Sequence, residues 1–253
     1  MAGRVLVTAG ASGIGRAMAR AFDDAGWRVW VTDIDRDALA ALPEGWRRSR
    51  VDAADEAAVA ALLAQVAEEW GGLDALCANA GVAGPTAPVE TVALDEWRRC
   101  VAVNLEGAFL ATKHAAPLMK RQRHGALIYT SSTAGIHGYP NRAPYAAAKW
   151  GIIGLMKTVA MELGPHGIRA NAICPGAVEG ARMQGVIERE AAAKGMTADA
   201  VRRGYAAGTS MRTFVEAEDI AAMALFLASD AARRVSGQVI AVDGHTENPD
   251  PRP

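Results

Sequence analysis

Ser132, Tyr145 and Lys149 carry side chains that together can move a proton on and off an alcohol oxygen. Tyr145 and Lys149 are four positions apart, so on a helix they share one face, with Cβ atoms about 5–6 Å apart. A lysine ammonium beside a phenol stabilises the phenolate and lowers the phenol pKa from its usual value of about 10. Because a general acid/base works best with a pKa near the working pH, the pair predicts acid/base chemistry, with the Ser132 hydroxyl holding the substrate oxygen. The alternative is that this spacing marks an ordinary helix surface.

The amino-terminal segment has the order expected of a nucleotide-binding turn. An apolar run over 4–8 suits a buried strand, and a glycine-rich segment over 9–15 and a helical pattern follow it. This order presents backbone N–H groups and the positive end of a helix to a pyrophosphate, and glycines let the backbone come close. The spacing differs from the usual G-x-G-x-x-G fingerprint. The residues expected to contact a dinucleotide here are Gly10, Ser12, Gly13, Ile14 and Gly15.

An acidic residue, Asp33, ends the second strand-like run over 28–32 and follows Gly15 by eighteen positions. A carboxylate at about this distance accepts hydrogen bonds from the adenosine ribose of NAD and repels the 2′-phosphate of NADP. Asp33 and its neighbour Ile34 therefore predict NAD as the cofactor, with NADP less favoured, although Arg36 can offset the repulsion. The alternative is that Asp33 caps the helix that starts near Arg36.

A second acidic residue, Asp52, follows the strand-like run over 47–51. With Ala53 it can lie against the adenine edge of the cofactor. It can also be the N-cap of the helical pattern that ends at Trp70. The sequence leaves both interpretations open.

Together these segments resemble the short-chain dehydrogenase/reductase family in its single-domain form, and the resemblance covers residues 3–244. The segment 8–15 is similar to the family's T-G-x-x-x-G-x-G motif, except that Ala9 occupies the first glycine position. We expect Gly10 to take over the turn. The resemblance implies a Rossmann-type, doubly wound α/β fold and NAD(P)-dependent interconversion of an alcohol and a ketone.

A second motif, at 78–81, is similar to the family's N-N-A-G, with Ala78 in place of the first asparagine. The resemblance implies that Asn79 steadies the central sheet beside the cofactor. It also implies that Asn104 completes a catalytic tetrad by organising a water next to Lys149, which bonds the nicotinamide ribose. The cofactor contacts implied in this motif are Asn79, Ala80 and Gly81.

The family's spacing selects Ser132 rather than Ser131 as the catalytic serine. The motif that starts at Pro175 is similar to P-G-x-V-x-T, but Gly180 replaces the threonine that normally helps to hold the nicotinamide end. The identity of that contact is therefore open. The further cofactor contacts that the resemblance implies are Pro175, Gly176 and Val178, together with Tyr145 and Lys149.

Substrate contacts are expected from two variable segments. One is the loop 137–141, which offers His137 and Tyr139, and the other is the segment 180–213 in the family's lid position, which offers Arg182. A lid arginine can recognise a carboxylate, sulfonate or phosphate on a substrate, whereas solvated charge on a lid helix is the alternative. His137 can equally be a surface residue.

Two alternatives to an NAD-dependent alcohol dehydrogenase or ketone reductase stay open. A 3-oxoacyl-thioester (acyl-carrier) reductase occurs in the same family but usually uses NADPH, and Asp33 argues against it. A non-catalytic dinucleotide-binding regulator would tolerate loss of the catalytic residues, all of which are present. The expected partner is a small-molecule alcohol or ketone, and the resemblance also implies a homotetramer formed through the long helices 94–120 and 143–164.

The composition is that of an ordinary globular protein, with 51% hydrophobic and 22% charged residues among 253 and a formal net charge of -1. This balance predicts neither a nucleic acid nor an acidic membrane as partner. No apolar run approaches the ~20 residues that span a bilayer, and no leader pattern opens the sequence, so we expect a cytoplasmic protein. Cys77, Cys100 and Cys174 are expected to be buried thiols without metal-ligand spacing, and Trp150 to pack in the core.

Short apolar runs alternate with helical patterns along the chain, which predicts a parallel sheet with helices on both faces. The predicted strands are 4–9, 28–32, 47–51, 73–78, 125–131, 168–174 and 238–242, and the predicted helices are 14–26, 55–70, 94–120, 143–164 and 216–229. Right-handed crossovers bring the candidate residues to the carboxyl edge of that sheet. We predict one domain over 1–246 and a flexible tail over 247–253.

Overall fold

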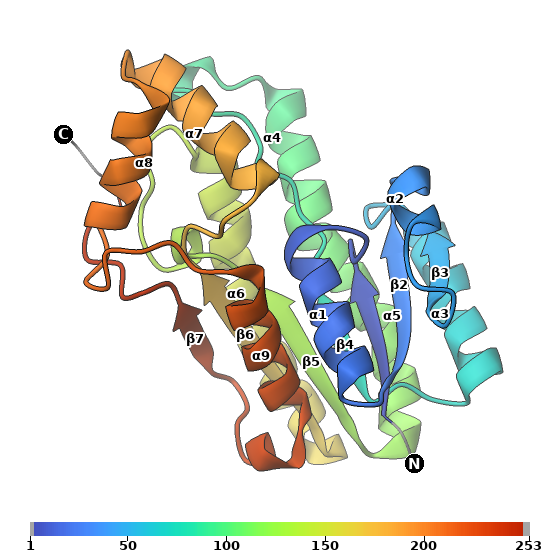
Figure 1. The fold of residues 1–253 in the computed structure, drawn as a ribbon. Coiled ribbons are helices and arrows are strands. Elements are labelled where there is room, and N and C mark those ends of the chain that lie inside the picture. Colours follow the sequence, from blue (N-terminus) through green and yellow to red (C-terminus); the bar gives the residue numbers. More distant parts are fainter. Residues whose placement is uncertain (1–2, 250–253) are drawn as a thin grey trace.

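The computed structural model describes residues 3–249 and contains one seven-stranded parallel sheet with the order β3-β2-β1-β4-β5-β6-β7 (Figure 1). The order reverses between β1 and β4, as in a doubly wound fold, and so confirms the predicted fold class. The strands are β1 (Arg4–Thr8), β2 (Arg28–Asp33), β3 (Arg47–Arg50), β4 (Ala75–Ala78), β5 (Gly125–Thr130), β6 (Ile168–Pro175) and β7 (Val239–Val242).

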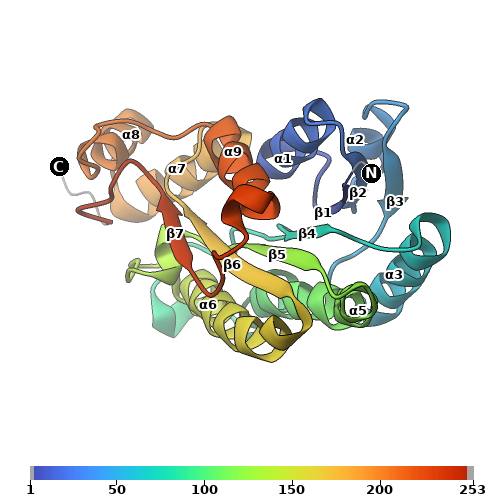
Figure 2. The ribbon, with the colours of Figure 1, turned by 90° about the horizontal axis from the view of Figure 1, so that it is seen from below.

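Helices cover both faces of the sheet (Figure 2). One face carries α1 (Gly13–Asp24), α2 (Arg36–Ala40) and α9 (Ala217–Ala228), and the other carries α3 (Glu56–Trp70), α5 (Gly107–Gln122) and α6 (Ala143–Leu163). Each layer of helices forms its own apolar core against the sheet. Because both faces are covered, the central strands are continuous apolar runs, and every residue of β4 and β5 is buried.

The helix predicted over 94–120 is interrupted. It begins as α4 (Leu94–Val101), passes through a π-helical turn (Ala102–Glu106) and continues as α5. A π-turn inserts an extra residue into an α-helix and is often found at functional sites. Here it carries Asn104, whose side chain is fully buried.

The segment after β6 folds into two helices above the carboxyl edge, α7 (Ala181–Lys194) and α8 (Ala198–Ala207) (Figure 1). We call α7 and α8 the lid. Their apolar residues form a separate small cluster around Ile187 and Val201. The carboxylate of Glu190 accepts hydrogen bonds from the Tyr205 hydroxyl and the Lys194 ammonium, each at 2.6 Å, and so ties the two helices together.

The residues after β7 return to the lid. The backbone N–H groups of Glu247 and Asn248 donate to the carbonyl of Gly208 at 2.9 and 3.0 Å, directly after α8. The first residues of the predicted flexible tail, Glu247 and Asn248, are therefore hydrogen-bonded to their own chain. The last residues of that predicted tail, 250–253, lie outside the described part of the chain.

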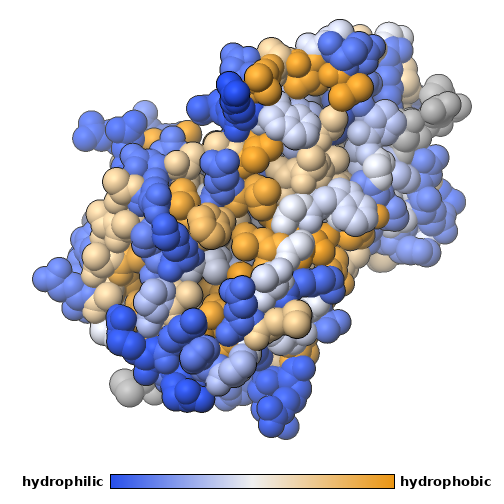
Figure 3. All heavy atoms as spheres, turned by 180° about the vertical axis from the view of Figure 1, so that it is seen from behind, coloured by the Kyte–Doolittle hydropathy of each residue, from blue (hydrophilic) through white to orange (hydrophobic). Residues whose placement is uncertain are grey.

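The prediction that Trp150 packs in the core is wrong, because 51% of its surface is exposed. It follows Lys149 on α6 and turns to the side of the helix that faces away from the sheet. Apolar patches lie on this side of the molecule in Figure 3. The exposed large apolar residues of α4, α5 and α6 are Leu94, Trp97, Phe109, Trp150 and Met161.

The three cysteines are buried and free, as predicted. Burial raises the pKa of the Cys77 thiol to about 12 and raises the pKa of the Cys174 thiol as well. Both thiols therefore stay protonated, with the apolar behaviour of core residues. Within residues 3–249, no helix is long and apolar enough to cross a bilayer.

Candidate active site

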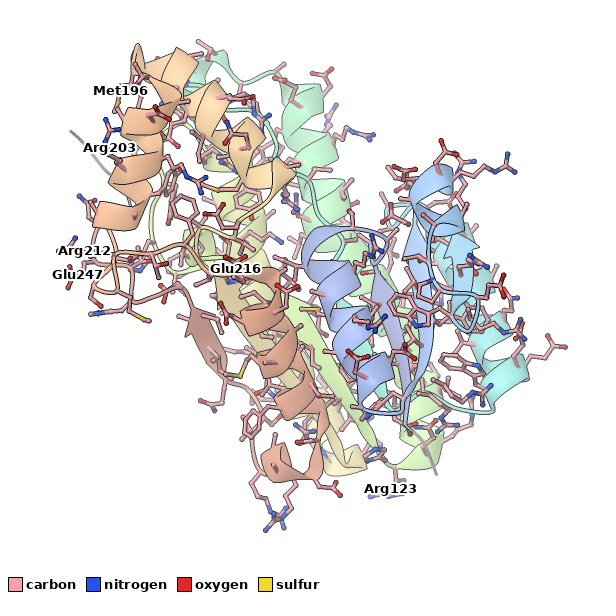
Figure 4. The ribbon with its side chains drawn as sticks, viewed as in Figure 1. Arg123, Met196, Arg203, Arg212, Glu216 and Glu247 are labelled. Carbon is pink, nitrogen blue, oxygen red and sulfur yellow. The ribbon has the colours of Figure 1, made fainter. Side chains whose placement is uncertain are left out.

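The candidate residues gather at the carboxyl edge of the sheet, below the lid. The segments that carry them follow β1, β2, β4, β5 and β6, and the carboxyl ends of parallel strands meet at one edge. Arg123, labelled in Figure 4, lies at the opposite end of the sheet, just before β5 starts. The predicted residues that are far apart in sequence are thus brought to one edge of the molecule.

Tyr145 and Lys149 lie one turn apart near the start of α6, with the Lys149 ammonium 5.6 Å from the centre of the Tyr145 ring. Lys149 is almost fully buried, and its Nζ donates to the Thr130 carbonyl at 2.8 Å. Burial lowers the pKa of Lys149, because desolvation penalises the charged form, while Tyr145 acts in the opposite direction. The bond to Thr130 fixes the cation beside the phenol.

The surroundings of Tyr145 lower the pKa of its phenol. Burial alone would raise its pKa, but the positive charges of Lys149, Arg182 and Arg142 and a hydrogen bond from Ser132 outweigh burial, so the pKa lies below 10. Opposite charge and hydrogen bonding both favour the phenolate over the phenol. This is the electrostatic arrangement that a tyrosine general base requires.

Ser132 and Ser131 have different surroundings. Ser132 caps the short 3-10 turn Thr133–Gly135, where its Oγ accepts from the Ala134 N–H at 3.1 Å and lies within reach of Tyr145. Ser131 is buried, and its Oγ donates to the Lys149 carbonyl at 2.9 Å. Ser132 is thus the serine next to the phenol, whereas Ser131 ties β5 to α6.

Asn104 lies in the π-turn with its amide directed at the site. Its Nδ2 donates to the carbonyls of Cys100 and Val82 at 2.8 and 3.0 Å. Its Oδ1 is buried and has no hydrogen-bond partner among the described residues. A Cβ placed on Gly81 would lie 2.6 Å from this Oδ1 and 3.4 Å from Lys149 Nζ. Asn104, Gly81 and Lys149 therefore converge, and any side chain at Gly81 would fill the space between them.

The glycine-rich turn differs from expectation at Ala9. Ala9 itself takes the left-handed conformation, with φ of +48°, and Gly10 does not, so Gly10 does not take over the turn. Gly10 is required for another reason: its N–H donates to the Thr32 carbonyl, and a Cβ there would lie 2.9 Å from Val31. A Cβ on Gly15 would collide with the Ala9 carbonyl.

Asn79 ties three strands together beside this turn. Its Nδ2 donates to the carbonyls of Thr8 and Ala9 at 3.2 Å, and its Oδ1 accepts from Thr130 at 3.1 Å. The N–H groups of Asn79 and Ala80 both donate to the Thr8 hydroxyl. Thr8 and Thr130 were not predicted as site residues, and a hydroxyl residue at the end of a buried strand is the sequence signal that marks them.

The carboxylate of Asp33 belongs to the glycine-rich turn. Its Oδ2 accepts from the Ala11 N–H at 3.2 Å and its Oδ1 from the Asp35 N–H at 3.2 Å. The N-cap of α2 is Asp35, whose carboxylate accepts from two N–H groups of the first turn. Asp33 is therefore not the cap of this helix, which was the alternative role considered for it. The next residue, Ile34, is exposed beside Asp33.

Asp52 is not the N-cap of α3, which was the alternative role considered for it. Asp55 caps α3 by accepting from the Ala58 N–H at 3.1 Å. Asp52 is exposed, and its carboxylate accepts only the nearby Ala54 N–H in the described residues. Ala53, beside it, packs against Gly107 at the start of α5.

The residues at the end of β6 lie beside β7. Pro175 is the last residue of β6, and the Gly176 N–H donates to the Val242 carbonyl at 3.0 Å. Val178 forms a parallel bridge with Val215 at the base of the lid. Gly180 then takes φ of +133° and ψ of 174°, a region essentially restricted to glycine. A threonine, which the family motif has at this position, would not adopt the conformation that Gly180 has here.

This edge fits a dinucleotide. Ser12 is the N-cap of α1, but its side chain makes no capping bond, and the first turn of α1 has no acidic residue. The positive end of α1 is thus open to a pyrophosphate, with Gly13 in the left-handed conformation and no atoms above it. Residues able to hold such a cofactor extend from this turn through Asp33 and Asn79 to Lys149.

Two of the three predicted substrate residues border Tyr145. Arg182, at the start of α7, donates from Nη1 to the Gly81 carbonyl at 3.1 Å, and its charge acts on Tyr145. The Tyr139 hydroxyl shares a hydrogen bond with Thr133 Oγ1 at 2.8 Å, and burial raises the pKa of Tyr139 to about 12. His137 is half-buried, and its backbone N–H donates to the Thr133 carbonyl.

Arg212, also in the predicted lid segment, is turned away from the site. Its guanidinium donates to the Ala207 carbonyl, and Figure 4 shows it beside Glu247 at the outer margin of the lid. Arg203 lies on the same outer side. Of these arginines, Arg182 is the one that reaches the catalytic residues.

Arg142 is a site residue that sequence reasoning missed. Its guanidinium carbon lies 4.7 Å from the centre of the Tyr145 ring, and its Nη2 donates to the Ala83 carbonyl at 3.0 Å. It is the N-cap residue of α6 and exposes only 9% of its surface. The available signal was its position three residues before Tyr145, about one helical turn.

The chain is similar to known proteins over nearly its whole length. A family description, enoyl-(acyl carrier protein) reductase, matches residues 8–245. The chain is 38% identical over 245 residues to cis-4-hydroxycyclohexanecarboxylate dehydrogenase of Sinomonas cyclohexanicum, with 94% of each chain covered. It is 34% identical over 247 residues to the 3-oxoacyl-[acyl-carrier-protein] reductase FabG of Thermotoga maritima, with 94% of this chain and 95% of that protein covered. The crystal structure of NAD+-bound xylitol dehydrogenase matches with a TM-score of 0.93 at 29% identity, covering 96% of this chain and 98% of that one.

Proposed function

The chain belongs to the short-chain dehydrogenase/reductase family, and on that premise we propose that it is an NAD-dependent oxidoreductase that interconverts a secondary alcohol and a ketone. The observation that carries this proposal is the phenol of Tyr145, which Ser132 and Lys149 hold in a position and an electrostatic environment that favour its ionised form. A regulator that only bound the dinucleotide would have no need of this arrangement.

Tyr145 is the general acid/base of the proposed reaction. In oxidation its phenolate takes the proton of the substrate hydroxyl, and in reduction its phenol returns a proton to the forming alkoxide. Ser132 donates a hydrogen bond to the same substrate oxygen, where negative charge develops. The nicotinamide, when bound, supplies the hydride acceptor or donor.

Lys149 and Asn104 support the proton transfer. The Lys149 ammonium lowers the pKa of Tyr145, and in the proposed complex it would also bond the nicotinamide ribose, as the family resemblance implies. The unpartnered Oδ1 of Asn104 beside Gly81 and Lys149 offers an acceptor for a water that links Lys149 to solvent. The dinucleotide itself is held by the turn at Gly13, by Asn79 and by the segment from Pro175 to Val178.

The carboxylate of Asp33 supports NAD over NADP. It accepts from Ala11 in the turn that would receive the pyrophosphate, and so lies at the ribose end of the proposed cofactor position. A 2′-phosphate there would meet a negative charge. Arg36, which could offset that charge, is exposed on the first turn of α2.

The relatives support a small secondary alcohol as substrate. The relative from Sinomonas cyclohexanicum is named for a ring alcohol, and the xylitol dehydrogenase is named for a sugar alcohol. We also propose that the protein works in the cytoplasm and assembles as a homotetramer through α4, α5 and α6, whose outer faces expose Trp97, Trp150 and Met161.

A second candidate is a 3-oxoacyl-thioester reductase that uses NADPH. It is favoured by the family description and by the FabG relative. Asp33 opposes it, because the same carboxylate that suits NAD disfavours NADPH.

Cofactor reduction, followed by absorbance, tests the proposal across ring alcohols, sugar alcohols and hydroxy acids with NAD and with NADP. We expect turnover with NAD on at least one class, and in Tyr145→Phe a fall in kcat of about 10²–10⁴-fold with NAD binding retained. The Tyr129→Phe variant is the matched control, because the Tyr129 hydroxyl is buried in the core and shares a hydrogen bond with Thr112. Reduction of 3-oxoacyl thioesters with NADPH, and no turnover with NAD, would establish the second candidate instead.

A further inference from the structure

The space around Tyr145 carries an excess of positive charge. The cations of Lys149, Arg182 and Arg142 all act on this one phenol. Ionised Tyr145 compensates one of them, and an oxidised nicotinamide would add another positive charge. The site therefore holds more positive charge than the proposed alcohol oxidation needs.

No carboxylate among residues 3–249 forms an ion pair with Arg142 or Arg182. Glu190 and Asp243, whose charges act on Tyr205 and Tyr139, are already engaged. Glu190 accepts from Lys194 and Tyr205. Asp243 accepts from the backbone N–H groups of His245 and Thr246 at 3.0 Å.

Arg142 is the less expected of the two arginines, because a buried arginine is normally paired. Its guanidinium has five N–H donors, and its one hydrogen bond in the described structure goes from Nη2 to Ala83. Its Nε is buried and has no partner among the described residues. A buried donor without a hydrogen-bond partner lowers the stability of the fold. We therefore expect the Nε edge of the Arg142 guanidinium to bind an acceptor that the described chain does not supply.

The charge of Arg182 acts on the same phenol from a different helix. It reaches down from the first turn of α7, whereas Arg142 comes from the start of α6. Its bond to the Gly81 carbonyl uses a single N–H of Nη1, which leaves the other N–H donors of the guanidinium available. The lid thus contributes a second guanidinium above the position proposed for the substrate.

We propose that Arg142, together with Arg182, binds an oxyanion head group on the substrate, a carboxylate or a sulfonate, so that the substrate is a small hydroxy acid rather than a neutral alcohol. This inference rests on the proposed function, because it places the anion beside the Tyr145 phenol. Arginine suits this task, since two parallel N–H donors match the two oxygens of such a group. Arg142 stacks on the Tyr145 ring, so the head group lies within a small molecule's length of the reacting carbon.

The first test compares 4-hydroxycyclohexanecarboxylate with its uncharged methyl ester. In the wild type we expect kcat/KM for the acid to exceed that for the ester by about 30-fold or more. In Arg142→Met the ratio falls to within about 3-fold of unity, and in Arg142→Lys, which keeps the charge but not the fork, it takes an intermediate value. Arg189→Met is the matched control, because Arg189 lies on the exposed side of α7.

A second readout needs no turnover. Cyclohexanecarboxylate and cyclohexanesulfonate, which lack the hydroxyl, are titrated by calorimetry into the enzyme saturated with NAD. We expect the dissociation constant of the tighter ligand to rise about 30-fold in Arg142→Met and in Arg182→Met, and to stay unchanged in Arg189→Met. The tighter of the two ligands identifies the head group. NAD affinity, measured on each variant, shows that the fold is kept, and if Arg142→Met loses it, Arg142→Lys and Arg182→Met carry the test.

Two results would overturn the inference. One is that Arg142→Met lowers turnover of the acid and of the ester by the same factor, which would confine Arg142 to its effect on Tyr145. The other is that neither anion binds to the wild-type enzyme with NAD. If the wild type oxidises neutral alcohols without preferring acids, the proposed function stands and this inference fails. If it oxidises no alcohol, the proposed function fails, and the calorimetry still decides whether the two arginines bind an anion.

Discussion

At the scale of single residues, the chemistry depends on what surrounds one phenol. Burial works against ionisation of Tyr145, and three cations and one hydroxyl work for it. Among these cations Lys149 has the largest effect on the pKa of Tyr145, and it is itself fixed by its bond to the Thr130 carbonyl. The reactivity of Tyr145 is therefore a property of its neighbours as much as of the residue.

The pH dependence of the reaction follows from this balance. Oxidation needs the phenolate, so its rate is expected to rise with pH through a midpoint below 10, because the pKa of Tyr145 is lowered. Reduction needs the phenol and is expected to fall over the same range. In Lys149→Met the largest opposing charge is gone and burial remains, so the midpoint should move upward.

The measurement is kcat against pH at saturating cofactor, so that weaker cofactor binding does not disguise the shift. Lys157→Met, two turns further along α6 and exposed, is the control and should keep the wild-type midpoint. An unchanged midpoint in Lys149→Met would show that Lys149 does not set the pKa of Tyr145.

The proton-transfer residues could be proposed from the sequence because they are local. The Tyr145–Lys149 spacing and the position of Ser132 need only a helix and the end of one strand. Arg142 is also local, three residues before Tyr145, but its burial could not be predicted, since it arises from a contact with Ala83 in a distant loop. The strained Ala9 was unexpected for a similar reason: the chain keeps a left-handed residue at the family's first glycine position although a side chain is present there.

At the scale of elements, the lid begins at a backbone conformation that only glycine adopts easily. Gly180 has φ of +133° and ψ of 174° and connects the bridge between Val178 and Val215 to the first residue of α7. The direction in which α7 leaves the sheet, and with it the position of Arg182, depends on this one residue.

Gly180→Ala should destabilise the lid. A Cβ in this region costs of order 1–3 kcal/mol, even though no atoms lie near the new methyl group. We expect faster proteolytic cleavage within the lid and a raised KM, with a smaller change in the melting temperature of the whole domain. Gly185→Ala is the control on the same helix, where alanine should stabilise by roughly 0.5–1 kcal/mol. Equal proteolysis rates for Gly180→Ala and the wild type would contradict the role given to Gly180.

The regular elements were predictable where their burial is uniform. All seven strands lie within two residues of the predicted ranges. The buried central strands show in the sequence as continuous apolar runs, whereas the edge strand β3 is mostly exposed and contains no apolar residue. The π-turn within 94–120 was not predicted, since it leaves the apolar pattern intact and shows only in the backbone. The two lid helices were not predicted as helices, because they pack mainly on each other and on few apolar residues.

At the scale of the whole molecule, the described chain leaves one helical face without cover. Trp97 on α4, Phe109 on α5, and Trp150 and Met161 on α6 are all exposed. Apolar patches lie on this side of the molecule (Figure 3). Aromatic and methionine side chains are enriched in protein interfaces. This face is the one expected to join subunits in the proposed homotetramer.

Disruption of this face tests the assembly. We expect the wild type to elute at the mass of four copies of the 26.5 kDa chain, and Trp150→Glu and Met161→Glu to elute as smaller species. The reason is that a carboxylate buried in an apolar interface is costly. Met211→Glu, at an exposed apolar residue in the loop after α8, should leave the elution volume unchanged. A monomeric wild type would remove the tetramer from the proposal.

The bonds from Glu247 and Asn248 to Gly208 have a practical consequence for expression of the protein. They attach the end of the described chain to Gly208, directly after α8 of the lid. An affinity tag fused at the carboxyl terminus would therefore pull on the lid in every kinetic experiment. β1 begins at the far end of the sheet from the site (Figure 1). A tag at the amino terminus is therefore expected to leave the measured kinetics unchanged.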